Sequence, residues 1–194
     1  MNTLSKPKNI NRQNYNDDVE DKWCGGKQTP EEEFAELFDK MYALCIKNNW
    51  GDPFNYSRAR EIYMANELGH KICITFRGAD GFEDKEKMTM PVEYKSTTQE
   101  KIKATYNGIS CQEDWKKQIE YLKNEKICKY EHHYIARFEM GKIVEMYKMN
   151  GDKVYEHLLP KLKKSFENKG SRKDPRLGAS MPTKYILENS EKII

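Results

Sequence analysis

The chain has 194 residues, of which 37% are hydrophobic and 34% are charged, a composition that fits one globular domain of ordinary size. It has no apolar run near the roughly 20 residues that span a bilayer and no signal-peptide pattern, so we expect a cytoplasmic protein that does not enter the membrane. The five cysteines are odd in number and show no C-x-x-C spacing, which argues against a disulfide framework or a zinc site.

The net charge of +3 is small, but the charges are unevenly distributed along the chain. Over residues 17–39, nine acidic residues oppose two lysines, and over residues 161–176 seven basic residues oppose two acidic ones. The basic region is typical of a local phosphate-binding surface, and equally of a solvated, lysine-rich helix end. Its candidate phosphate contacts are Arg172, Lys173 and Arg176.

The first part of the chain is polar and aperiodic, which predicts an irregular arm over residues 1–28 followed by a single domain over 29–194. The run Thr29-Pro30-Glu31-Glu32 has the pattern of a helix start, with Thr as N-cap, Pro at the first helical position and Glu three residues after the cap. Apolar residues at helical spacing continue this helix to about Asn48.

A second helix is expected over residues 57–68, with Gly69 ending it. Two strands follow, over 71–76 and 88–96. In the second of these strands the residues alternate between its two faces. One face carries Met88, Met90, Val92 and Tyr94, and the other carries Thr89, Pro91, Glu93 and Lys95.

The second half of the chain reads as helix, two strands and helix. The pattern Ser110-x-x-Glu113 predicts a capped helix start with a buried face that includes Trp115. Two strands over 133–139 and 142–149 are joined by a short turn, and a long helix comes after them. The tail is expected to be a basic loop followed by one strand.

The most informative segment joins an aspartate in a turn, Asp80, to the run Glu93-Tyr94-Lys95 at the end of a strand. Residues two apart on a strand point the same way, so Glu93 and Lys95 share a face. Two carboxylates supply the oxygen ligands that Mg²⁺ prefers, and an ammonium beside them can assist phosphodiester hydrolysis. Alone, an E-x-K pattern is also common on any solvated strand.

The order of helix, strand, strand from an aspartate, strand ending in E-x-K, helix and strand resembles the PD-(D/E)XK nuclease superfamily, which includes most type II restriction endonucleases. The resemblance implies an α/β (α+β) fold with a restriction-endonuclease-like core, in which helices flank a central mixed β-sheet. It also implies that Asp80 and Glu93 hold Mg²⁺, that Lys95 acts on the attacking water or the transition state, and that Glu61 joins the site from the first core helix.

Several choices within this resemblance stay open. Asp84 competes with Asp80 as the first ligand, and Glu67 competes with Glu61. One or two metal ions can act at such a site. A histidine-based nuclease using His132 or His133 is a weaker alternative, because we find no matching Asn or His partner on a following helix.

The resemblance implies a Mg²⁺-dependent, sequence-specific endonuclease that cuts double-stranded DNA. Such an enzyme is expected to act as a homodimer in a bacterial, phage or viral setting, with a methyltransferase for the same DNA site. Gln99, Lys103 and Asn107 follow the E-x-K strand and are candidate DNA contacts beside the basic tail. The alternatives are a structure-specific or repair nuclease of the same superfamily and a non-catalytic DNA-binding protein.

Overall fold

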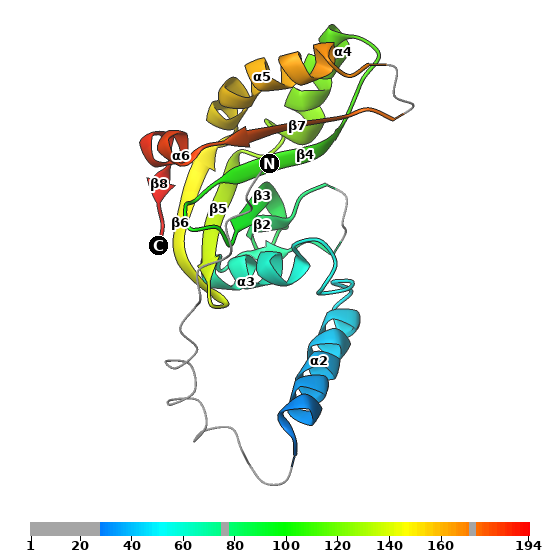
Figure 1. Cartoon of the computed structure of the whole chain (residues 1–194), viewed down its shortest axis with the longest axis vertical. Helices are drawn as coiled ribbons and strands as arrows, with labels where there is room; N and C mark the ends of the chain where they lie inside the picture. The colour runs from blue at the N-terminus through cyan, green and yellow to red at the C-terminus, as the bar shows by residue number, and fades with distance from the viewer. Residues whose placement is uncertain (1–27, 75–77, 171–173) are drawn as a thin grey trace, which may run out of the picture. The chain divides into compact units, whose positions relative to one another are not determined.

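The structure is a computed structural model that describes residues 28–74, 78–170 and 174–194 (Figure 1). Contacts divide the chain into two compact units, Met1–Ala43 and Leu44–Ile194. The expected boundary between an arm and a single domain at residue 28 remains a prediction. Across the described ranges, no helix is both long enough and apolar enough to cross a membrane.

Helix α2 (Pro30–Lys47) begins where the capping pattern predicted. The backbone N–H of Glu32 donates to Oγ1 of Thr29 at 3.2 Å, and the Thr29 N–H donates to Oε2 of Glu32 at 2.9 Å. These reciprocal bonds satisfy N–H groups that a helix start leaves without intrahelical partners.

Helix α3 (Arg58–Leu68) also has nearly its expected bounds. Gly69 ends it in the left-handed conformation with a φ of 70°, which glycine adopts without steric cost. A strand was expected over residues 71–76, and the structure has β1 over Lys71–Ile72. Residues 75–77 lie outside the described part of the chain.

The larger sheet has six strands in the order β1-β2-β3-β5-β6-β8. Strand β3 runs parallel to β5, and the other neighbours are antiparallel, so the sheet is mixed as expected. The remaining strands of this sheet are β2 (Gly81–Asp84), β3 (Thr89–Thr97), β5 (His132–Glu139), β6 (Lys142–Asn150) and β8 (Glu191–Lys192).

The predicted alternation along β3 is wrong at its first residues. Met88 and Met90 have positive φ values of 52° and 59°, which break the regular pleat. Both side chains are therefore exposed, while Val92 and Tyr94 are buried as the alternation predicted. The irregularity lies beside Pro91, which cannot donate a ladder hydrogen bond.

A second, two-stranded sheet pairs β4 (Ala104–Ser110) with β7 (Arg176–Met181). Strand β4 falls in a segment whose strand character we did not predict. The helix after it, α4 (Trp115–Tyr121), is capped by Asp114, whose side chain accepts from the Lys117 N–H, so the predicted cap at Ser110 is wrong. Ser110 instead ends β4, and its pairing with Arg176 keeps it extended.

The C-terminal half contains the short π-helical turn η2 (Leu122–Lys126), the long helix α5 (Gly151–Glu167) and helix α6 (Thr183–Asn189). Helix α5 matches the long helix that the sequence predicted, whereas α6 was not expected. In Figure 1, α5 lies alongside β7, which it also contacts.

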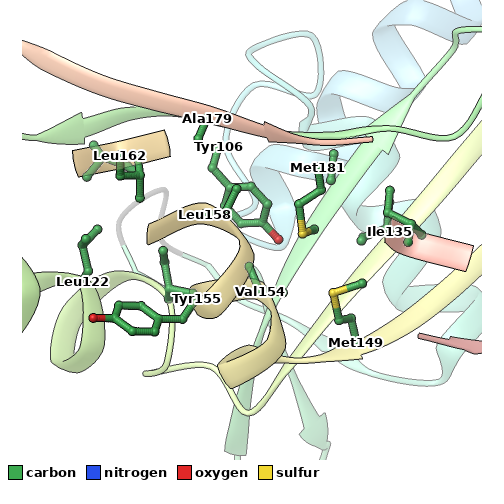
Figure 2. Packing of buried hydrophobic residues seen from close by; sticks show 14 of the residues in the cluster. Tyr106, Leu122, Ile135, Met149, Val154, Tyr155, Leu158, Leu162, Ala179 and Met181 are labelled. Carbon is green, nitrogen blue, oxygen red and sulfur yellow. The ribbon is translucent and has the colours of Figure 1, made fainter. Parts of the chain in front are cut away.

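The two faces of the large sheet carry separate cores. On one face, Met64 and Ala65 of α3 pack against Val92, Tyr94 and Tyr134. On the other, the apolar face of α5 packs over the sheet and the β4–β7 pair, as Figure 2 shows for Val154, Leu158, Tyr106, Met181 and Ile135. Strand β3 therefore packs against α3 through Val92 and Tyr94, and its alternate residues Glu93 and Lys95 point to the other face of the sheet.

Candidate active site

Asp80 lies where β2 and β3 separate. The last pair of the β2–β3 ladder is Gly81 with Val92, whereas β3 stays paired with β5 as far as Thr97. At the point of separation, Oδ2 of Asp80 accepts a hydrogen bond of 2.7 Å from the backbone N–H of Tyr94. The carboxylate thus occupies the position of the next ladder partner and is held beside the E-x-K segment.

Close packing fixes this turn. A Cβ atom on Gly81 would lie 2.6 Å from the Tyr94 hydroxyl and 3.1 Å from the backbone oxygen of Lys71. A side chain at this position would displace the Tyr94 hydroxyl and crowd the Lys71 backbone, so glycine fits directly after Asp80 without moving either. The turn predicted around Asp80 is therefore a tightly packed element beside β3.

Glu93 and Lys95 contact each other on β3. The Lys95 ammonium forms an ion pair with Oε1 of Glu93 and donates to the Tyr94 carbonyl oxygen at 3.2 Å. Both side chains are about one-fifth exposed, at 18% and 20%. Charges that are partly withdrawn from water interact more strongly than charges on an open surface.

Glu61 enters the site from the first turn of α3, where it lies 3.4 Å from a guanidinium nitrogen of Arg58. Arg58 is almost fully buried, and its Nε donates to the Trp50 carbonyl oxygen at 2.7 Å. Glu67, the competing glutamate, is exposed on the same helix.

One cavity of about 570 Å³ unites most of these groups. It takes its walls from the start of α3, the Asp80 turn, the second half of β3 and the exposed face of β4. Its lining residues are Tyr56, Ser57, Glu61, Asp80, Tyr94, Lys95, Ser96, Thr97, Gln99, Lys103, Thr105 and Asn107.

Burial and neighbouring charges shift the pKa values of Asp80 and Lys95. Burial and then the negative charge of Glu93 raise the pKa of Asp80 well above its ordinary value, with Glu61 adding to the effect and Lys95 opposing it. Burial alone would lower the pKa of Lys95, but the Glu93 and Asp80 carboxylates outweigh it and raise that pKa. Among the described residues, three carboxylates thus share two cationic side chains, Arg58 and Lys95.

The donor set suits a hard divalent cation. Asp80 and Glu93 offer carboxylate oxygens, and the carbonyl of Tyr94, the residue after Glu93, offers a third oxygen, so water can complete the coordination of Mg²⁺. Within the described ranges, no three His, Cys, Asp or Glu side chains are arranged to hold a metal ion. The site accordingly fits Mg²⁺ with two carboxylates and retained water, and does not fit a closed structural metal centre.

The competing residues have other contacts. Oδ1 of Asp84 accepts from the backbone N–H groups of Glu86 and Lys87 at 3.0 Å each, which stabilises the turn between β2 and β3. Nδ1 of His132 donates to Oε1 of Glu83 at 2.7 Å on the α3 side of the sheet. His133 is fully buried beside Glu93 in the β3–β5 register.

The candidate DNA contacts divide into two groups. Gln99, Lys103 and Asn107 line the cavity together with Asp80 and Lys95. Arg176 begins β7, where it contacts Asp174 and Ser110, at the opposite end of the β4–β7 ladder from Ala104. Arg172 and Lys173 lie outside the described residues.

Sequence reasoning missed Tyr56 at the site, and it expected Ser96 and Tyr106 in the segment that borders the site without naming either as a site residue. Tyr56 lies at the cavity wall, is 86% exposed and has a φ of 53°, which is uncommon for a residue other than glycine. Ser96 also lines the cavity, and its buried Oγ has no hydrogen-bond partner within the described part of the chain. Tyr106 lies beneath Lys95, and the alternation of buried and exposed residues from Ala104 to Asn107 was the signal that would have placed it.

The sequence matches no known family model, and no curated protein shows significant similarity to it.

Proposed function

We propose that this protein is a Mg²⁺-dependent phosphodiester hydrolase that cuts double-stranded DNA at specific sequences, with Asp80, Glu93, Lys95 and Glu61 at its active site. The observation that carries the proposal is the excess of carboxylate at the cavity among the described residues: Asp80 is half-buried beside Glu93 and Glu61, and its pKa is raised. A divalent cation would neutralise that charge in place of a proton.

In the proposed reaction Asp80, Glu93 and the Tyr94 carbonyl would hold Mg²⁺, which lowers the pKa of bound water and polarises the phosphate. Lys95 orients the attacking water and stabilises the negative charge that develops on the phosphate oxygens. Glu61, held by Arg58, accepts hydrogen bonds from water at the cavity wall. The exposed Gln99, Lys103 and Asn107 side chains contact the bases and phosphates of the bound strand.

The arrangement of elements also supports the proposal. Helix α3, an antiparallel β1-β2-β3 series and a parallel β3–β5 pair follow the order that the PD-(D/E)XK resemblance implies. Under this proposal the chain acts as a homodimer, so that two sites cut two strands. It would work in the cytoplasm beside a methyltransferase that protects the same DNA site.

The direct test is incubation of a mixed DNA library, with linear, branched and flapped substrates, in Mg²⁺, followed by sequencing of the ends. We expect discrete ends at one short sequence motif, and no ends with EDTA or with the Lys95→Met variant. The matched control is Glu83→Gln, which removes a carboxylate charge on the opposite face of the sheet and should cut normally.

Other outcomes would redirect the assignment. Cuts confined to junctions or flaps would favour a structure-specific or repair nuclease. Binding to DNA without any cleavage in Mg²⁺ or Mn²⁺ would favour a non-catalytic DNA-binding protein.

A further inference from the structure

The Lys95 ammonium has a third partner besides Glu93 and the Tyr94 carbonyl. Its Nζ lies 5.0 Å from the centroid of the Tyr106 ring, within the range of a cation–π interaction. Tyr106 reaches this position from β4, a strand of the other sheet. The ammonium therefore lies between a carboxylate on its own strand and an aromatic face that comes from elsewhere in the fold.

His133 holds that ring in place. Nδ1 of His133 lies 3.0 Å from the Tyr106 hydroxyl, and Nε2 lies 3.1 Å from the Ile127 carbonyl oxygen. Because a carbonyl can only accept, Nε2 carries the proton, and in the neutral ring Nδ1 accepts from the Tyr106 hydroxyl. Both side chains are buried, so the ring, the imidazole and the backbone of Ile127 form one fixed series.

This series occupies the Tyr106 hydroxyl with His133. Its proton is donated to His133, and burial followed by the charge of Glu93 raises the pKa of Tyr106 well above its ordinary value. Tyr106 therefore offers the site an aromatic face and no competing anion. An aromatic face attracts an ammonium and does not compete for a hard cation, which binds oxygen ligands.

We propose that Tyr106 and His133 are positioning residues for Lys95: they keep its ammonium at the cavity when a divalent cation takes the Glu93 carboxylate. The inference rests on the proposed function and adds to it what happens to Lys95 once its ion pair with Glu93 is opened. Without the ring, the released ammonium would turn toward bulk water through its flexible side chain.

The first experiment needs no activity. In protein with ¹³C-labelled lysine, the Lys95 methylene signals, assigned by their loss in Lys95→Met, should show a ring-current shift from Tyr106. Addition of Ca²⁺ should enlarge that shift, because the ammonium leaves Glu93 for the ring. The shift should persist in Tyr106→Phe and vanish in Tyr106→Met. A shift that is absent in the wild type, or that survives in Tyr106→Met, overturns the proposal.

The second experiment measures single-turnover cleavage at saturating DNA. We expect Tyr106→Met to slow cleavage about tenfold and Tyr106→Phe to slow it about twofold, in line with the strength of a partly desolvated cation–π contact. DNA affinity in Ca²⁺ should stay within about twofold for both variants, since the contact acts on Lys95 and not on binding. Tyr134→Met, which removes a buried ring from the other face of the sheet, is the control and should cleave normally.

The outcomes separate this inference from the proposed function. If Tyr106→Met folds, loses the ring-current shift and still cleaves at the wild-type rate, the positioning role is wrong and the nuclease proposal stands. If the wild type cleaves no DNA while Lys95 shifts as expected, the proposed function fails and the positioning of Lys95 stands. Should Tyr106→Met not fold, His133→Gln keeps the ring but loosens it, and an unchanged Lys95 shift with an unchanged rate would refute the role of His133.

Discussion

Two polar clusters lie beside the same sheet, and each holds a half-buried carboxylate whose pKa is shifted in the opposite direction to that of the other. Glu83 accepts hydrogen bonds from His132 at 2.7 Å and from the Tyr134 hydroxyl at 2.8 Å, with Lys148 at 3.5 Å. Burial opposes its ionisation, but these donors outweigh burial and lower its pKa. At Asp80, burial and neighbouring carboxylates act together and raise the pKa.

The opposite pKa shifts of Glu83 and Asp80 show how a structural cluster can be told from a reactive one when both contain acidic and basic side chains. The Glu83 cluster neutralises its charge with its own donors, so it stabilises the fold and has little to offer a ligand. In the part of the chain that the structure describes, the Asp80 cluster has more carboxylates than cationic side chains beside a cavity, an arrangement that is typical of functional sites. Each prediction below changes one member of this comparison.

The largest expected effect is at Glu93 and Lys95. Ala substitution of either should lower the cleavage rate at least about 10³-fold, because a metal ligand or the charge that stabilises the transition state is lost. The fold should remain, as measured by far-UV circular dichroism and urea unfolding. A purified, folded variant that cuts DNA at close to the wild-type rate would show that the site is assigned wrongly.

Asp80→Asn and Asp84→Asn should differ in metal binding. Asp80→Asn should weaken Mg²⁺ binding, measured by calorimetry, at least about tenfold, because a carboxylate ligand becomes a weaker amide ligand. DNA affinity should fall much less, since lost negative charge also reduces repulsion of phosphate. Asp84→Asn should be mild, as Asp84 stabilises a turn. A greater loss of metal binding at Asp84 than at Asp80 would reverse the choice between them.

The dependence of stability on pH should have opposite signs in the two clusters. Asp80 has a raised folded pKa, so its contribution to stability is present at acid pH and is lost as the pH rises through that pKa. Glu83 has a lowered folded pKa, so its contribution is present above its unfolded pKa and is lost as the pH falls through the folded value.

Urea unfolding without divalent ions, from pH 4 to pH 8, tests these signs. Asp80→Asn should gain stability over the wild type toward pH 8, and Glu83→Gln should lose about 1–2 kcal/mol at neutral pH. The loss in Glu83→Gln should shrink toward acid. Equal effects of pH on the two variants would remove the distinction between the clusters.

Contacts at the cavity should affect which DNA sequences are bound. Ala substitution of Lys103 or Asn107 should change the preferred sequence, since both line the cavity and are placed to meet base edges. Losing one base contact costs about 1–3 kcal/mol at the cognate site and little elsewhere. Selection from a randomised duplex library measures this, and an unchanged consensus would show that these side chains contact only the backbone.

The smallest effect is expected in the basic tail. Ala substitution of Arg172, Lys173 and Arg176 together should weaken binding to all sequences alike. Each lost phosphate contact should reduce the slope of log K against log salt by about 0.9. Titrations of cognate and random duplexes at two salt concentrations would reveal this, and an unchanged slope would mean that the tail is only a solvated surface.

The sequence by itself determined the local elements and their order. The capping residues Thr29 and Glu32, the left-handed stop at Gly69 and the Met140-Gly141 turn between β5 and β6 are short-range features, and all three were predicted. The mixed sheet flanked by helices was implied by the resemblance to the PD-(D/E)XK superfamily, and the structure has such a sheet. The spacing of Glu93 and Lys95 also placed both on one face of β3, because a strand alternates with a period of two.

Only the tertiary structure decided the rest, because it depends on contacts between distant segments. The register of β3 with β5 puts His133 beside Glu93, and the separation of β2 from β3 holds Asp80 against Tyr94. The pairing of β4 with β7 aims Tyr106 at Lys95. The raised pKa of Asp80 and the lowered pKa of Glu83 could not be predicted from the sequence for the same reason. Both depend on burial and neighbouring charges, which are properties of the folded chain.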